Sequence, residues 1–137
     1  MGVEENKATL VGLLEAIEAS DRAAIEAKFL PDGRWVIPKG APDPVAGTHR
    51  GAKTIAEMMV GAIEASFDAS AVDWRPGLIM AEGDAVMLEA NLRAKTQAGD
   101  LYDNHYVFVA EFDPASGRIA ELREHVDTSY AAGFFEV

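Results

Sequence analysis

The second half of the chain alternates between apolar and polar residues, and this period of two limits the folds that it can adopt. From Ala71 to Val126 the alternation runs in long segments that are separated by turn signals at 82–84, 98–100 and 113–117. Successive side chains of a β-strand point to opposite faces of a sheet, and clusters of Gly, Asp and Pro mark the turns between strands. The pattern therefore predicts four antiparallel strands joined as a meander.

Each of these runs has one apolar set of residues, which we expect to face the helices. In chain order the sets are Val72, Trp74, Leu78 and Met80; Val86, Leu88, Ala90 and Leu92; Tyr102, Asn104, Tyr106, Phe108, Ala110 and Phe112; and Ala120, Leu122, Glu124 and Val126. A one-residue slip or a bulge would exchange the two faces of a strand.

The first half of the chain is helical in pattern. Apolar residues at helical spacing predict helices over about 4–19, from the cap Ser20-Asp21 through Phe29, and from Ile55 to Phe67. A short strand is expected at 34–37, followed by a Pro- and Gly-rich loop over 38–51. Helices followed by a long antiparallel sheet predict one α+β domain over 1–137, in which the curved sheet wraps as a cone around the N-terminal helices. The mouth of such a cone can hold a ligand.

Composition narrows the classes of function. The chain of 137 residues has 12 basic and 23 acidic residues and no cysteine. The absence of cysteine excludes thiol catalysis and cysteine zinc sites, and it is compatible with a cytoplasmic protein. The net charge of −11 disfavours nucleic acid as a partner. Neither a transmembrane helix nor a signal peptide is apparent, so no membrane association is expected.

Two segments carry a resemblance to a known family. The run WVIPKGAPDPVAGTHRGAKTI, followed by YDNHYVFVAEFDPASGRIAELREHVDT, resembles the SnoaL-like branch of the nuclear transport factor 2-like superfamily. This superfamily includes polyketide cyclases, ketosteroid isomerases and limonene epoxide hydrolases. The resemblance implies a cone-shaped fold whose pocket serves enzymes, ligand binders and interaction modules alike.

The catalytic positions of the two better-known enzyme types are mostly apolar in this chain. The resemblance places the ketosteroid isomerase acids and tyrosine at Ile37, Leu13 and Phe108, so steroid isomerisation by that constellation is not expected. The Arg and Asp pair of the epoxide hydrolases falls at Ala90 and Leu92. The acid on the last strand remains, as Glu124.

Glu124 is the leading candidate for catalysis. An apolar environment favours the protonated form of a carboxyl group and raises its pKa, which makes it a usable general base near neutral pH. Asn104, Tyr102 and Tyr106 lie on the same face of the neighbouring strand and can donate hydrogen bonds to a carbonyl or enolate oxygen. We expect cofactor-free proton abstraction next to a carbonyl, as in a cyclase or isomerase. The predicted lining of the pocket is Trp35, Ile37, Trp74, Leu88, Tyr102, Phe108 and Leu122.

Other interpretations of the same residues stay open. Glu124 can instead pair with one of the arginines Arg34, Arg93 and Arg123, and the tyrosines and tryptophans can be ordinary core residues. His125 and Asp127 share the opposite face of the last strand and form a competing acid–base site. The scattered histidines do not have the spacing of a metal site, so no metal is expected.

The outer face of the sheet also contains apolar residues. Ile79, Met87, Val107, Val109 and Ile119 are interleaved there with charged residues. Such a face favours a partner, and relatives of this family commonly dimerise through it, so we predict a homodimer. The C-terminal segment YAAGFFEV, with Phe134 and Phe135, is expected to close the mouth of its own pocket or to cross to a second subunit.

Three functional classes therefore compete. The first is a small cyclase or isomerase with Glu124, or Asp127, as its base. The second is a non-catalytic binder of a hydrophobic metabolite. The third is an interaction module whose cone is filled by side chains, and this class predicts no accessible cavity.

Overall fold

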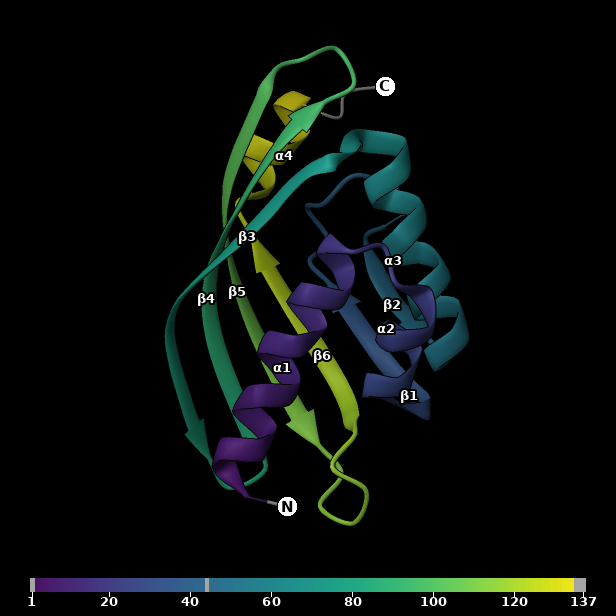
Figure 1. The fold of residues 1–137 in the computed structure, drawn as a ribbon, viewed down its shortest axis with the longest axis vertical. Coiled ribbons are helices and arrows are strands. Elements are labelled where there is room, and N and C mark those ends of the chain that lie inside the picture. The colour runs from purple at the N-terminus through teal and green to yellow at the C-terminus, as the bar shows by residue number, and fades with distance from the viewer. Residues whose placement is uncertain (1, 44, 135–137) are drawn as a thin grey trace.

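The computed structural model describes residues 2–43 and 45–134, which form four helices and six strands (Figure 1). The helices are α1 (Val3–Glu18), α2 (Arg22–Lys28), α3 (Ala52–Ser66) and α4 (Thr128–Phe134). The strands are β1 (Phe29–Ile37), β2 (Gly47–Arg50), β3 (Phe67–Glu82), β4 (Ala85–Thr96), β5 (Leu101–Phe112) and β6 (Ile119–Val126). The α+β architecture agrees with the prediction.

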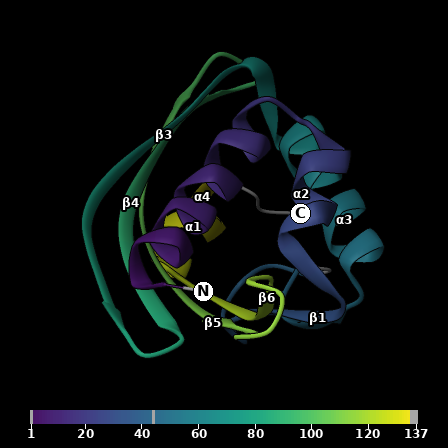
Figure 2. The same cartoon turned by 60° about the horizontal axis from the view of Figure 1, so that its bottom comes forward.

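The strands form a single sheet in the order β2-β1-β6-β5-β4-β3. Strands β3 to β6 are the predicted antiparallel meander. The sheet is nevertheless mixed, because β1 runs parallel to β6 and antiparallel to β2. Figure 2 shows the sheet curling around α1, with α2 and α3 on the other side of the molecule. The curved inner face of the sheet and the helices thus enclose the core, as expected for a cone.

One strand lies inside the segment that was predicted to be a loop. Strand β2 pairs with the end of β1, where Trp35 lies opposite His49. Gly47 is the first residue of β2 and Gly51 directly follows its last residue, and their φ angles are 103° and 94°. Glycine adopts such positive values without steric cost, so the chain can turn sharply on both sides of a four-residue strand. The strand was not predicted because the Pro and Gly content of this segment is typical of a loop.

A bulge in β3 reverses the predicted faces at its end. The register against β4 shifts between Pro76 and Ile79, and Ile79 pairs with Leu88. As a result Ile79 packs against the core, whereas Leu78 and Met80 are each 55% exposed. The prediction that Leu78 and Met80 face inward is therefore wrong.

A second irregularity brings Ile119 into the core. The register of β5 and β6 shifts next to Phe112, which pairs with Ile119, and Ile119 is completely buried. Of the residues assigned to the outer face, Met87, Val107 and Val109 remain there and are half-buried. The homodimer stays a prediction. No helix within the described residues is long and apolar enough to span a membrane.

Candidate functional site

A cavity of about 480 Å³ lies between the inner face of the sheet, the second half of α3 and residues 41–43 and 45. Its wall is largely apolar and includes six of the residues singled out from the sequence, namely Trp35, Ile37, Trp74, Tyr102, Tyr106 and Glu124. This volume is typical of small-molecule sites. A cavity of this size speaks against a cone filled by side chains.

Three residues that were predicted to line the pocket lie elsewhere. Leu88, Phe108 and Leu122 are almost completely buried in the hydrophobic core and do not belong to the cavity wall. They lie on the predicted face of the sheet, but that face is longer than the cavity. The alternation of apolar and polar residues identifies the inner face of the sheet. It does not show which part of that face the helices leave uncovered to line the cavity.

Glu124 reaches the cavity because the pairing of β5 and β6 is regular around it. Glu124 lies opposite Phe108, and both residues are on the inner face. The indole N–H of Trp35 donates a hydrogen bond to Glu124 Oε1 over 3.2 Å. Burial raises the pKa of Glu124 to about 7, and the Trp35 hydrogen bond opposes this shift. The carboxyl group can therefore exchange a proton near neutral pH.

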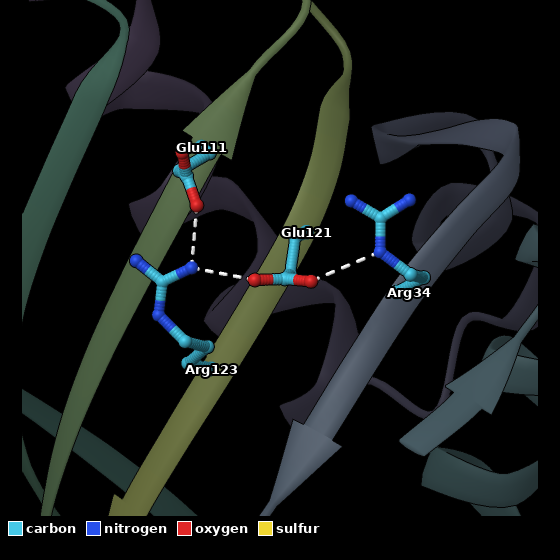
Figure 3. Close-up of polar contacts among 4 residues, drawn as sticks. All are labelled: Arg34, Glu111, Glu121 and Arg123. Carbon is cyan, nitrogen blue, oxygen red and sulfur yellow. Dashed lines mark hydrogen bonds and ion pairs between the residues drawn. The ribbon is translucent and has the colours of Figure 1, made fainter.

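The three arginines that could have neutralised Glu124 have other partners. Figure 3 shows Glu121 on the outer face of β6, between Arg34 and Arg123. Arg34 Nε lies 2.9 Å and Arg123 Nη1 lies 2.6 Å from its two carboxylate oxygens. Arg93 Nε lies 3.7 Å from Asp103 Oδ2. These arginines hold the carboxylates of the outer face, so the ion-pair interpretation of Glu124 finds no support.

The tyrosines of β5 form a hydrogen-bonded chain that ends at the cavity. The hydroxyl oxygens of Tyr102 and Tyr106 are 2.8 Å apart, and Asn104 Nδ2 donates to the Tyr102 hydroxyl over 2.8 Å. Burial raises the pKa of Tyr106 well above its ordinary value. Tyr106 therefore stays protonated at neutral pH and can act as a donor.

Asn104 lies behind the tyrosines and does not line the cavity. Its side-chain oxygen accepts from the backbone N–H of His105 over 2.9 Å, and its Nδ2 also donates to the carbonyl of Asp127 over 3.1 Å. These backbone partners fix the orientation of the amide, because the N–H group requires the acceptor oxygen on its side and the carbonyl group requires the donor nitrogen on its side. Asn104 can orient the Tyr102 hydroxyl without touching a ligand itself.

The structure does not bring the competing acid–base residues together in the cavity. His125 is exposed and lies opposite Val107 on the outer face. Asp127 follows β6, and its Oδ1 accepts a hydrogen bond from the backbone N–H of Tyr130 in α4. His105 Nε2 lies 3.6 Å from Glu89 Oε2. Within the described residues, no group of three or more His, Asp or Glu side chains has an arrangement that could hold a metal ion.

The entrance to the cavity was not predicted from the sequence. Three described lining residues, Asp43, Gly61 and Ala65, are exposed, and they place the opening between Asp43 and α3. The neighbouring helix α4 contributes Ala131 to the wall. Phe134 packs against Tyr102 with ring centroids 5.2 Å apart, whereas Phe135 lies outside the described residues. The small residues of α3 were a signal that the helix leaves room beside it.

We predict that Gly61→Ala stabilises the protein while keeping the cavity open. A Cβ atom added at Gly61 would meet no atom within 4 Å. Glycine in an exposed helix interior costs about 1 kcal/mol relative to alanine, so the free energy of unfolding should rise by about that amount in urea denaturation. Gly61→Phe should instead obstruct the entrance and weaken the binding of a hydrophobic fluorophore. A destabilised Gly61→Ala variant would contradict the open position of this residue.

The comparisons with known proteins agree on the fold. The model of the SnoaL-like domain matches residues 10–122. No curated protein matches the chain. Several solved structures do, among them a nuclear transport factor 2-like protein of unknown function from Burkholderia pseudomallei, with a TM-score of 0.84 and 21% identity over 100% of both chains.

Two further structures are similar over most of their length. TerC, co-crystallised with polyporic acid, has a TM-score of 0.83 and 18% identity over 97% of this chain and 99% of its own. A putative SnoaL-like polyketide cyclase from Jannaschia has a TM-score of 0.79 and 15% identity over 96% and 91%. At these identities the likeness concerns the fold alone.

Proposed function

We propose, from the premise that the chain belongs to the SnoaL-like domain family, that it is a cofactor-free enzyme of the cyclase or isomerase kind. Its substrate would be a small hydrophobic carbonyl compound, bound in the cavity between α3 and the sheet. Glu124 would act as the general base. The observation that carries the proposal is a carboxyl group in an apolar cavity whose pKa burial raises to about 7.

The proposed step is proton transfer from carbon. The carboxylate of Glu124 takes a proton from the carbon next to the carbonyl group, and the electron pair of the broken C–H bond forms the carbon–carbon double bond of an enolate. Isomerisation is completed when Glu124 returns the proton to another carbon. In a cyclisation, the enolate carbon attacks a second carbonyl group of the substrate, and the new alkoxide takes the proton from Glu124, which restores the base.

The tyrosines would stabilise the charge that develops on oxygen. Tyr106 lines the cavity, stays protonated at neutral pH and can donate to an enolate oxygen. Tyr102 and Asn104 would support this donor through the chain of hydroxyl and amide hydrogen bonds. Donors that are positioned before the reaction stabilise an oxyanion without reorganisation at the moment of charge transfer.

The test is hydrogen exchange at the carbon next to a carbonyl. Uncharged bicyclic ketones, such as 1-tetralone and 2-acetonaphthone, are incubated with the protein in D₂O, and deuterium incorporation is followed by mass spectrometry. Exchange faster than in buffer is expected. A protein that binds these ketones without accelerating exchange would contradict the proposal.

A non-catalytic binder is the second candidate. The largely apolar wall favours it, because hydrophobic and aromatic side chains alone are sufficient to hold a hydrophobic metabolite. TerC was crystallised with a small organic compound in a similar fold, which is compatible with either candidate. Ligand binding that is unchanged in Glu124→Gln, without any exchange by the native protein, is the result that this alternative predicts.

A further inference from the structure

The charged groups that line the cavity have one sign. Among the described lining residues, the acidic side chains are Glu124 on β6 and Asp43 at the entrance, and no Lys, Arg or His is present. The other titratable groups of the wall are the hydroxyls of Tyr102 and Tyr106 on β5. The net charge of the whole chain is also negative, at −11. A negative ligand group would therefore meet no opposite charge in the cavity wall that the structure describes.

The surroundings of Glu124 do not neutralise its charge. From β1, Trp35 donates a single hydrogen bond from a neutral indole. From β5, Tyr102 and Tyr106 interact with Glu124 as neutral phenols. His49 contacts the ring of Trp35, with centroids 5.5 Å apart, but it does not line the cavity, and its Nε2–H donates to the carbonyl of Val45. Glu121, on the outer face of the same strand, holds both Arg34 and Arg123.

We propose that the cavity accepts uncharged hydrophobic molecules and excludes those that carry a carboxylate, sulfonate or phosphate group. This inference rests on the proposed role of the cavity as a small-molecule site, and it names the class of molecule that the site takes. A ligand anion beside Glu124 would bring two like charges into an apolar space, where their repulsion is stronger than in water. An uncharged carbonyl compound avoids this cost and keeps Glu124 available as a base.

The size of the exclusion is limited by the ability of Glu124 to take up a proton. An anion can enter if Glu124 is first protonated. This requirement lowers the affinity for the anion about tenfold for each pH unit above the pKa of Glu124. With that pKa at about 7, the contribution of Glu124 should be about tenfold at pH 8. It should almost disappear at pH 6, where the group is already protonated.

A matched pair of fluorophores tests the proposal. N-phenyl-1-naphthylamine is uncharged, and 8-anilino-1-naphthalenesulfonate has the same skeleton with a sulfonate group added. Both become fluorescent in an apolar site, so their affinities can be measured by titration at pH 6 and pH 8. Measurements in 1 M NaCl, where the Debye length is about 3 Å, suppress the general repulsion by the surface charge.

We expect the native protein to bind the uncharged probe more tightly at pH 8, and Glu124→Gln to reduce the ratio of the two affinities by about tenfold. Glu57→Gln is the matched control, because it removes one negative charge from an exposed position on α3 outside the cavity. It should leave the ratio unchanged within about twofold.

Each other outcome has a separate meaning. Equal binding of both probes by the native protein, or an unchanged ratio in Glu124→Gln, would overturn the exclusion of anions while leaving the cavity as a binding site. Binding of the sulfonate alone would do the same. If neither probe bound to the native protein or to Glu124→Gln, the proposed small-molecule function would fail, and this inference would fail with it.

Discussion

Replacing Glu124 with Gln should slow enzyme-catalysed hydrogen exchange at least about 100-fold, because general-base catalysis typically contributes a factor of about 10² to 10⁴. The amide has nearly the same shape as the carboxyl group but cannot accept the proton. The fold and the cavity should be retained. In the native protein the exchange rate should rise with pH up to about pH 7 and level off above it, as Glu124 becomes ionised.

The control for this experiment lies three residues earlier on the same strand. Glu121→Gln makes the same chemical change on the outer face of the sheet, where Glu121 is paired with two arginines. It should leave the exchange rate and its pH profile unchanged. Equal losses of activity in the two variants would indicate a general effect on the fold and would remove Glu124 from its proposed role. Retention of exchange in Glu124→Gln would do so as well.

The second large effect concerns stability. The pKa of Glu124 is raised from 4.5 to about 7, so the folded protein holds this proton more tightly than the unfolded chain does. Between these pH values the folded state binds more protons, and the free energy of unfolding therefore falls as pH rises. The full cost, reached above pH 7, is about 3 kcal/mol at 1.36 kcal/mol per pKa unit. Glu124→Gln should remove this cost.

The measurement is urea denaturation at pH 5, 6, 7 and 8. The variant should be about as stable as the native protein at pH 5 and more stable at pH 8 by up to about 3 kcal/mol. Glu121→Gln should instead destabilise the protein, and by about the same amount at all four pH values. Hydrogen bonds from Arg34 and Arg123 lower the pKa of Glu121, so its contribution is fully present above pH 4.5 and is lost only as the pH falls through the lowered value. A pH-independent difference for Glu124→Gln would contradict the burial of Glu124 as a carboxyl group without a cationic partner.

The sequence was sufficient to predict the meander and the face on which Glu124 lies. The pairing of β4, β5 and β6 is regular around this residue, so the period of two in the sequence correctly predicted which side chains face inward. The alternation pattern failed where the register shifts, between Pro76 and Ile79 in β3 and next to Phe112 in β5. At each shift one extra residue exchanges the two faces of a strand, and the sequence pattern does not show where this happens. Leu78 and Ile119 were assigned to the wrong face for this reason.

The candidate site could be predicted in part. The sequence indicated Glu124 and the aromatic residues around it, but not the entrance formed by Asp43, Gly61 and Ala65. An entrance depends on where a loop and a helix fail to cover the sheet, and this is decided by packing between segments that are distant in the chain. The sequence also left open whether Glu124 pairs with an arginine. Arg34 lies on the neighbouring strand β1 and Arg123 lies on β6 itself, and only the register of the strands places both beside Glu121.

The central claim is that Glu124 is a desolvated carboxyl group without a cationic partner in the described part of the chain. A carbon-detected NMR titration of its carboxyl resonance, assigned with Glu124→Gln, measures this directly. We predict a pKa of about 7. A pKa at or below the ordinary value of 4.5 would mean that the group is solvated or ion-paired in solution, and it would contradict both the proposed base and the proposed exclusion of anions.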